Sequence, residues 1–305
     1  MARDAARSIA KSVNDLPREG HVLVSAHIDR RYSFFAQPAG RTHYQLVGPA
    51  GGAVVVLVPG ATLPLAVWEP LIAPMVEAGF RVLRYDFPGR GYSSALDPRS
   101  NLTSYVDQLD ELLTGIGIAE PVCLVGLALG SLIVAAYALE HRGRVARVAL
   151  IAPDGVATRF SPGERLFAAP VIGDLFSAVM GGRILMARVP RYSTREDVQD
   201  FVRRLLEFEL SQPHFRRAVL TTVRTLPIHE GEAFYRRLAQ QGVSARIVWG
   251  RNDGVTPIKA AERLRSFFGY DSVEIMDGVG HLPFVEEPLL VAGLLMSHFR
   301  GRHGE

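Results

Sequence analysis

Short apolar runs alternate with helical patterns from about residue 53 to the end of the chain. Apolar runs bounded by Gly, Pro or Asp are typical of strands buried on both faces, which occur in parallel sheets covered by helices. We predict such strands at residues 53–58, 81–85, 122–125, 145–151, 245–249 and 272–275. Leucines and valines recur at helical spacing between them, so the alternation predicts an α/β fold with a mostly parallel central sheet flanked by helices.

Two parts of the chain depart from this alternation. Shorter runs at 21–28, 32–36 and 43–47 predict an antiparallel edge to the sheet. Strand signals vanish between Asp154 and Gln240, so we predict a core formed by residues 1–153 and 241–305 and an inserted helical cap formed by residues 154–240. The first half of the cap is apolar and is expected to pack on the core, with some side chains lining an apolar substrate pocket: Phe160, Leu166, Phe167, Val171, Ile172, Leu175, Phe176, Val179, Met180, Ile184, Leu185 and Met186.

Composition argues against several classes of protein. The 34 basic residues are nearly balanced by 31 acidic ones, and the net charge of +3 is not gathered in a basic block, so nucleic acid is not an expected partner. The single cysteine, Cys123, excludes an internal disulfide framework and a zinc site built from several thiolates. The residues after Met1 lack the apolar run of a secretory leader, and the stretch from Leu127 to Leu139 is too short to cross a bilayer. We therefore expect a cytoplasmic protein without a transmembrane segment, in which 127–139 contains a buried helix.

The motif Gly126-Leu127-Ala128-Leu129-Gly130 stands where a predicted strand runs into a helix. Glycines two places either side of a central residue suit a sharp, strained turn, because larger side chains there would collide with the strand or the helix. This frame resembles the nucleophile elbow, G-x-S-x-G, of the α/β-hydrolase family. The resemblance extends from about Tyr44 to Phe299 and implies an α/β-hydrolase fold.

Two loops resemble further parts of the family's pattern. The segment Pro59-Gly60-Ala61-Thr62 resembles the oxyanion loop, although Pro59 stands where a histidine is usual. In the family, backbone N–H groups of this loop and of the residue after the nucleophile stabilise the developing oxyanion, and the matching positions are Ala61 and Leu129. The Thr62 hydroxyl either joins them or stabilises the turn. The segment from Asp86 to Ser93 resembles the family's D-x-x-G-x-G-x-S turn, whose role is structural.

The resemblance also supplies an acid and a base. Asp253, just past a buried strand, matches the family's triad acid, and Asp154, at the end of an earlier strand, is the alternative. His281 stands in a glycine-flanked loop directly after the last strand and matches the family's histidine. In this interpretation Asp253 orients His281, which activates a nucleophile at the elbow.

The nucleophile position is occupied by Ala128, whose methyl group can neither attack a carbonyl carbon nor donate a proton. Ser131, one helical turn further on, and Cys123, inside the buried strand, are poor replacements. Removing the nucleophile of an unrelated serine hydrolase lowers turnover by about 10⁶, so we do not expect this chain to hydrolyse a substrate. Two explanations remain. Ala128 is an engineered Ser-to-Ala change in an otherwise complete site, or the chain is a naturally serine-free member that uses His281 for elimination, cyclisation or proton transfer, or that binds a small ligand.

For the parent activity, the resemblance implies an esterase or lactonase. Such an enzyme hydrolyses a carboxylic ester, lactone or related acyl bond through an acyl-enzyme, with no metal and no organic cofactor. The apolar cap favours a small hydrophobic molecule as substrate. Haloalkane and epoxide hydrolases share the fold but place an aspartate at the elbow, which nothing else in the sequence supports. Neither the substrate, the pathway nor the oligomeric state follows from the sequence.

Overall fold

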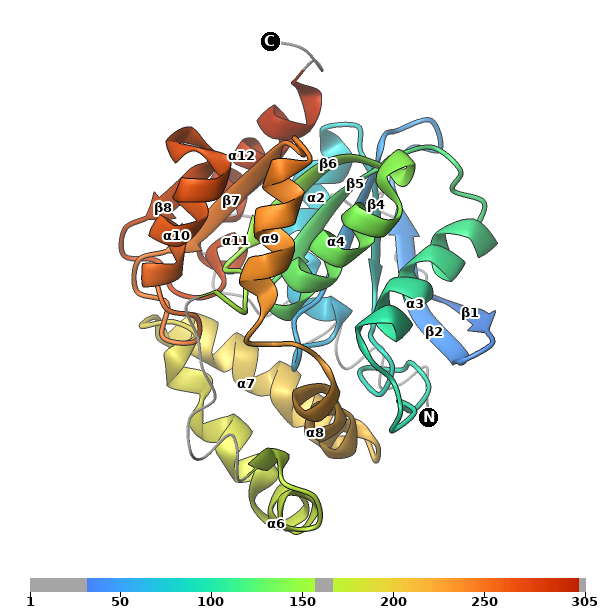
Figure 1. The fold of residues 1–305 in the computed structure, drawn as a ribbon, viewed down its shortest axis with the longest axis vertical. Coiled ribbons are helices and arrows are strands. Elements are labelled where there is room, and N and C mark those ends of the chain that lie inside the picture. The colour runs from blue at the N-terminus through green and yellow to red at the C-terminus, as the bar shows by residue number, and fades with distance from the viewer. Residues whose placement is uncertain (1–31, 157–166, 302–305) are drawn as a thin grey trace.

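The computed structural model describes residues 32–156 and 167–301. At its centre lies an eight-stranded sheet in the order β1-β2-β4-β3-β5-β6-β7-β8 (Figure 1). The strands from β3 to β8 pair in parallel, whereas β1 pairs with β2, and β2 with β4, in antiparallel. The strands are β1 (Ser33–Gln37), β2 (Gly40–Val47), β3 (Val54–Val58), β4 (Arg81–Tyr85), β5 (Val122–Leu127), β6 (Val145–Ile151), β7 (Ala245–Gly250) and β8 (Val273–Met276).

Helices cover both faces of this sheet (Figure 1). One face carries α3 (Leu102–Gly115), α4 (Leu129–Glu140), α9 (Gly231–Gln240) and α10 (Lys259–Phe268). The other carries α2 (Glu69–Glu77), α11 (Pro283–Glu286) and α12 (Pro288–Arg300). Short 3₁₀ turns are η1 (Leu65–Trp68), η2 (Arg142–Arg144), η3 (Val189–Arg191) and η4 (Tyr270–Ser272).

Three more helices stand apart from the sheet and pack on one another. They are α6 (Ile172–Ala187), α7 (Glu196–Ser211) and α8 (Phe215–Thr225), in the lower part of Figure 1. Helix α7 contacts η1, which follows the carboxyl end of β3. This group therefore covers the edge of the sheet where the parallel strands end.

The local sequence explains where several helices begin. The Asn101 side chain accepts a hydrogen bond from the Ser104 N–H, while the Ser104 hydroxyl accepts one from the Asn101 N–H, so a capping box starts α3. Helices α2 and α12 carry Pro70 and Pro288 in their first two positions, where the missing N–H is not needed.

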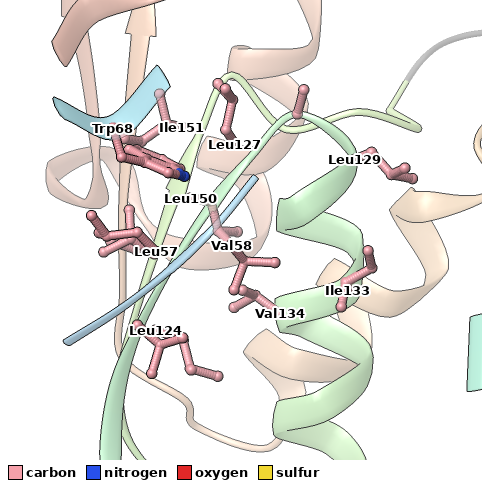
Figure 2. Packing of buried hydrophobic residues seen from close by; sticks show 14 of the residues in the cluster. Leu57, Val58, Trp68, Leu124, Leu127, Leu129, Ile133, Val134, Leu150 and Ile151 are labelled. Atoms are coloured by element: carbon pink, nitrogen blue, oxygen red, sulfur yellow. The ribbon is translucent and has the colours of Figure 1, made fainter. Parts of the chain in front are cut away.

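A continuous apolar core holds the sheet to its helices. Figure 2 shows β5 and α4 approaching the turn between them, with Leu124 and Leu127 on the strand and Ile133 on the helix. Trp68 is fully buried and stacks on Phe284 of α11, with 4.4 Å between the ring centroids. These contacts fix the strand ends on which the site is built.

The predicted α/β-hydrolase architecture is confirmed. All six parallel strands lie within two residues of their expected bounds, and the antiparallel edge is formed by β1 and β2. The expected buried helix is α4, while the run predicted at 21–28 lies outside the described residues. Helix α9 falls inside the range expected for the cap, yet it packs on α4 and α10 beside the sheet.

The expectation that the first half of the cap packs on the core is wrong for the first two turns of α6 and the residue before it, whereas Met186 near the end of α6 does pack against the core. Phe167, Met180, Ile184 and Leu185 are half-buried. Val171, Ile172, Leu175, Phe176 and Val179 are exposed. The residues that α6 buries are instead small, namely Gly173, Ser177 and Gly181. Small residues allow α6 to approach α8 closely, and the large apolar side chains of its first two turns lie on the exposed side. Phe160 and Leu166 lie outside the described residues.

Candidate active site

The turn between β5 and α4 is strained at Ala128. Its backbone has φ 47° and ψ −113°, a combination that side-chain-bearing residues rarely adopt. A Cβ on Gly130 would come within 3.0 Å of the carbonyl oxygens of Val58 and Pro59, and a Cβ on Gly126 would meet the backbone of Gly130 equally closely. Only glycine fits at either position, as the sequence motif predicts. Ala128 itself is 6% exposed, and its N–H donates to the Ile151 carbonyl at 2.9 Å.

Asp253 and His281 come together from two neighbouring strand ends. Asp253 follows β7 and His281 follows β8, and these strands are paired in parallel. The distance between Nδ1 of His281 and Oδ2 of Asp253 is 2.8 Å. Both side chains are almost completely buried. When Nδ1–H donates to the carboxylate, the histidine is held in the tautomer whose Nε2 can accept a proton.

The Asp253 carboxylate is held by three further donors. Oδ1 accepts from the N–H groups of Val255 and Thr256, at 2.7 and 2.8 Å, and Oδ2 accepts from the Thr256 hydroxyl at 2.6 Å. Burial by itself raises the pKa of Asp253, but the His281 ring and the bonds from Thr256 outweigh it and hold the pKa below its ordinary value. The carboxylate is therefore ionised and fixed beside the ring at neutral pH.

The histidine loop is fastened from two sides. The His281 N–H donates to the carbonyl of Tyr192 at 2.7 Å, and the Tyr192 ring meets the imidazole edge to face at 5.4 Å. The Gly280 N–H donates to Oε1 of Glu286 at 2.8 Å. Tyr192, which follows η3 between α6 and α7, thus joins this helical group directly to His281.

The proposed oxyanion donors lie in braced loops. Among the described residues, neither the Ala61 N–H nor the Leu129 N–H donates to a protein acceptor, so both are available to a ligand. The Thr62 hydroxyl lies 3.0 Å from the hydroxyl of Tyr192. Nε of the buried Arg90 donates to the Ala61 carbonyl at 3.0 Å, and the same guanidinium donates to the Thr222 hydroxyl of α8 at 2.6 Å.

The other two aspartates considered from the sequence do not pair with His281. The Asp154 N–H donates to the Ala128 carbonyl at 3.3 Å and its carbonyl accepts from the Tyr235 hydroxyl, whereas the imidazole of His281 is paired with Asp253. The Asp86 carboxylate is hydrogen-bonded to the ring of His43 and accepts a hydrogen bond from the N–H of Leu65. These contacts agree with a structural role for the turn that begins at Asp86.

The two possible replacement nucleophiles are unsuited to that role. The Ser131 hydroxyl is fully buried and donates to the Gly126 carbonyl at 2.7 Å, so it is engaged within the helix start. Cys123 is buried in β5, and burial raises the pKa of its thiol to about 11, which keeps it protonated. Within the described parts of the chain, no cluster of three His, Cys, Asp or Glu side chains is placed to hold a metal ion, and no helix is long and apolar enough to span a membrane.

The arrangement offers a base, an orienting acid and two free N–H donors at the carboxyl ends of parallel strands. It offers no hydroxyl or thiol at the elbow, where the backbone presents only the methyl group of Ala128. Fold and site together define the class of proteins that carry a nucleophile elbow on a parallel sheet.

Comparison with known proteins identifies this class. The model of the alpha/beta hydrolase family matches residues 55–294, so the chain belongs to that family. It is 31% identical to a 2-hydroxy-6-oxononadienedioate/2-hydroxy-6-oxononatrienedioate hydrolase of Escherichia coli over 271 residues, which cover 80% of this chain and 87% of the relative.

Solved structures agree on the fold. An enol-lactonase from Burkholderia xenovorans superposes with a TM-score of 0.73 at 19% identity, covering 88% of this chain and all of that one. An esterase from Exiguobacterium antarcticum superposes with a TM-score of 0.74 at 17% identity, covering 89% of this chain and all of that one.

Three residues of this site were not found by sequence reasoning. Thr256 stands three residues after Asp253, a spacing at which a hydroxyl and an N–H can bond the carboxylate of an Asx turn, so a local signal existed. Tyr192 contacts His281, which is 89 residues away in the sequence, and Arg90 contacts Ala61, which is 29 residues away. No local sequence pattern marks such tertiary contacts.

Proposed function

We propose that this chain is an α/β-hydrolase of the serine esterase or lactonase type in which Ala128 occupies the nucleophile position and disables hydrolysis. The observation that carries the proposal is the backbone of Ala128 itself. A non-glycine residue at φ 47° and ψ −113° costs of the order of 1–3 kcal/mol, and such strain persists where the surrounding structure imposes it, commonly at catalytic sites. The elbow thus keeps a costly geometry that presents a side chain for attack.

With a serine at position 128, each retained group has a step to perform. Nε2 of His281 takes the hydroxyl proton as the oxygen attacks the substrate carbonyl, and Asp253 stabilises the resulting imidazolium. The N–H groups of Ala61 and Leu129 stabilise the oxyanion. Transfer of that proton to the leaving oxygen releases the alcohol and leaves an acyl-enzyme, which water then hydrolyses with His281 again as the base.

Hydrophobic acyl substrates suit the immediate surroundings of these residues. Leu127, Leu129 and Leu282 flank the elbow and the histidine, and all three are buried and uncharged. The relatives named as a hydrolase, an enol-lactonase and an esterase support the same broad reaction class. The proposed substrate is therefore a small hydrophobic ester, lactone or related acyl compound.

A second candidate function rests on the completeness of the Asp253–His281 pair. An oriented imidazole with a free Nε2 can remove a proton from a bound ligand without any nucleophile at the elbow. A naturally serine-free chain would then catalyse an elimination, a cyclisation or a proton transfer, or bind a small ligand.

Restoring the hydroxyl separates the two candidates. The chain as given, Ala128→Ser, and Ala128→Ser combined with His281→Ala would be compared for labelling by a fluorophosphonate and for turnover of activated esters and lactones. We expect labelling and turnover in Ala128→Ser alone, with a gain of up to about 10⁶ over the other two proteins. A folded Ala128→Ser protein that is neither labelled nor active would refute the hydrolase proposal and favour the second candidate.

A further inference from the structure

The side chain of Tyr192 spans the site from the histidine loop to the proposed oxyanion loop. Its ring meets the His281 imidazole edge to face, with 5.4 Å between the ring centroids, and its hydroxyl lies 3.0 Å from that of Thr62. Thr62 follows β3 and His281 follows β8, and β5, which ends just before Ala128, lies between these two strands in the sheet. A side chain that contacts both loops therefore lies over the elbow.

The two hydroxyls of Thr62 and Tyr192 keep one proton unused. Each hydroxyl carries one proton, and the hydrogen bond between them uses only one of the two. Within residues 32–156 and 167–301, neither hydroxyl has another hydrogen-bond partner. Thr62 is half-buried and Tyr192 is 7% exposed, so the pair lies at the border of accessible space. The second proton is therefore available to a ligand.

Tyr192 is the better of the two hydroxyls to donate that proton outward. When hydroxyls form a chain that ends on an anion, each donates to the next and the bonds strengthen one another, and the more acidic phenol is the stronger donor at the end of the chain. Burial raises the pKa of Tyr192 in spite of the hydrogen bond from Thr62, which lowers it, so the phenol is protonated at neutral pH. It can donate a hydrogen bond without giving up its proton.

We infer, on the basis of the proposed function, that the Tyr192 hydroxyl is a third hydrogen-bond donor to the acyl oxygen of the substrate, beside the N–H groups of Ala61 and Leu129. Thr62 directly follows Ala61, and neighbouring Cα atoms are about 3.8 Å apart. A hydroxyl bonded to Thr62 therefore lies close to the oxygen that the Ala61 N–H would stabilise. A fixed donor aimed at a developing charge in a buried site lowers the barrier of the step that creates the charge.

Infrared spectroscopy of a bound ester tests this contact without hydrolysis. The chain as given would be mixed with p-nitrophenyl butyrate labelled with carbon-13 at its carbonyl, and compared with Tyr192→Phe and Tyr137→Phe. The first variant keeps the ring beside His281 and loses only the hydroxyl. Tyr137 is the matched control, because it is fully buried on α4 and its hydroxyl donates to Asp110 at 2.9 Å. We expect the carbonyl stretching frequency to be higher in Tyr192→Phe than in the other two proteins, since a hydrogen bond to the carbonyl oxygen lowers it.

Turnover of the same ester in the Ala128→Ser background provides a second test. We expect Tyr192→Phe to lower kcat by about 10²-fold with little change in KM, as the loss of one oxyanion donor does, and Tyr137→Phe to change neither. Thr62→Val leaves the phenol in place, so its loss of kcat should be smaller. Circular dichroism of each variant checks that the fold is kept.

The outcomes separate this contact from the proposed function. An inert Ala128→Ser protein, with a carbonyl frequency that still depends on the Tyr192 hydroxyl, would refute hydrolysis and support the contact. An active Ala128→Ser protein in which Tyr192→Phe changes neither kcat nor the carbonyl frequency would overturn the contact alone, because the hydroxyl would then only fasten the loop. Thr62→Val with a loss of kcat as large as that of Tyr192→Phe would assign the donated proton to Thr62 instead. Absence of bound ester in the chain as given would also overturn it.

Discussion

Replacing Gly130 by alanine tests whether the elbow is as tightly packed as its geometry indicates. The added Cβ would come within 3.0 Å of two carbonyl oxygens at the end of β3, closer than real Cβ atoms approach such atoms. Both oxygens belong to the backbone of Val58 and Pro59, which are buried and cannot rotate away as a side chain would. Either β3 or the start of α4 must therefore shift.

Overpacking of a rigid core costs about 1–3 kcal/mol, and the double contact with backbone places Gly130→Ala near 3 kcal/mol. A loss of this size lowers the melting temperature of a chain of 305 residues by roughly 5 °C. Thermal and urea unfolding followed by circular dichroism would measure it. Gly143→Ala is the matched control, because a Cβ there meets nothing within 4 Å. Equal melting temperatures for the two variants would refute the close approach of α4 to β3.

Two further predictions concern the acid of the site. Because the folded pKa of Asp253 lies below its ordinary value, its ionised form stabilises the fold above about pH 4 and this contribution disappears as the pH falls through the folded pKa. Asp253→Asn should thus be less stable than the unaltered chain at pH 7. Urea unfolding at pH 7, 5 and 3 should show that the difference in free energy of unfolding between the two proteins shrinks as the pH falls. A difference that stays constant with pH would contradict a lowered pKa for Asp253. In the Ala128→Ser background, Thr256→Val removes the hydroxyl that donates to the Asp253 carboxylate, and we expect it to lower kcat by about tenfold with little change in KM. Thr256→Ser keeps the hydroxyl and should retain activity. An equal loss of kcat in both variants would indicate a merely structural role for Thr256.

The sequence predicts those features of this fold that depend on residues close together in the chain. Buried parallel strands need unbroken apolar runs, and the sharp turn at Ala128 needs glycines on both sides, so both were visible as patterns. The choice between Asp253 and Asp154 was harder, because both follow buried strands. The structure pairs Asp253 with His281, since β7 and β8 are neighbours, while Asp154 follows β6 one strand further away.

The expected burial of the apolar residues at the start of α6 was wrong, because it depends on which part of the molecule the helix packs against. An apolar helix face can either pack on the core or remain exposed, and the hydrophobicity of its residues does not distinguish the two arrangements. The signal that was overlooked is the repeat of Gly173, Ser177 and Gly181, whose small size marks the face that packs closely on α8. Small residues at every fourth position therefore indicate the buried side of a helix better than the large apolar ones do here.

The helical group α6 to α8 and the proposed oxyanion loop are joined through buried polar side chains rather than through apolar contact alone. Arg90 donates to the Ala61 carbonyl and to the Thr222 hydroxyl of α8, while Tyr192 bonds Thr62 with its hydroxyl and His281 with its carbonyl. A guanidinium buried among neutral acceptors is stable only while all of them stay in place, because an unmet donor in the interior is costly. Movement of the helices α6 to α8 away from the sheet would therefore break hydrogen bonds of Arg90 and Tyr192, the residues that hold Ala61 and His281. The polar geometry of the site thus depends on the position of these helices.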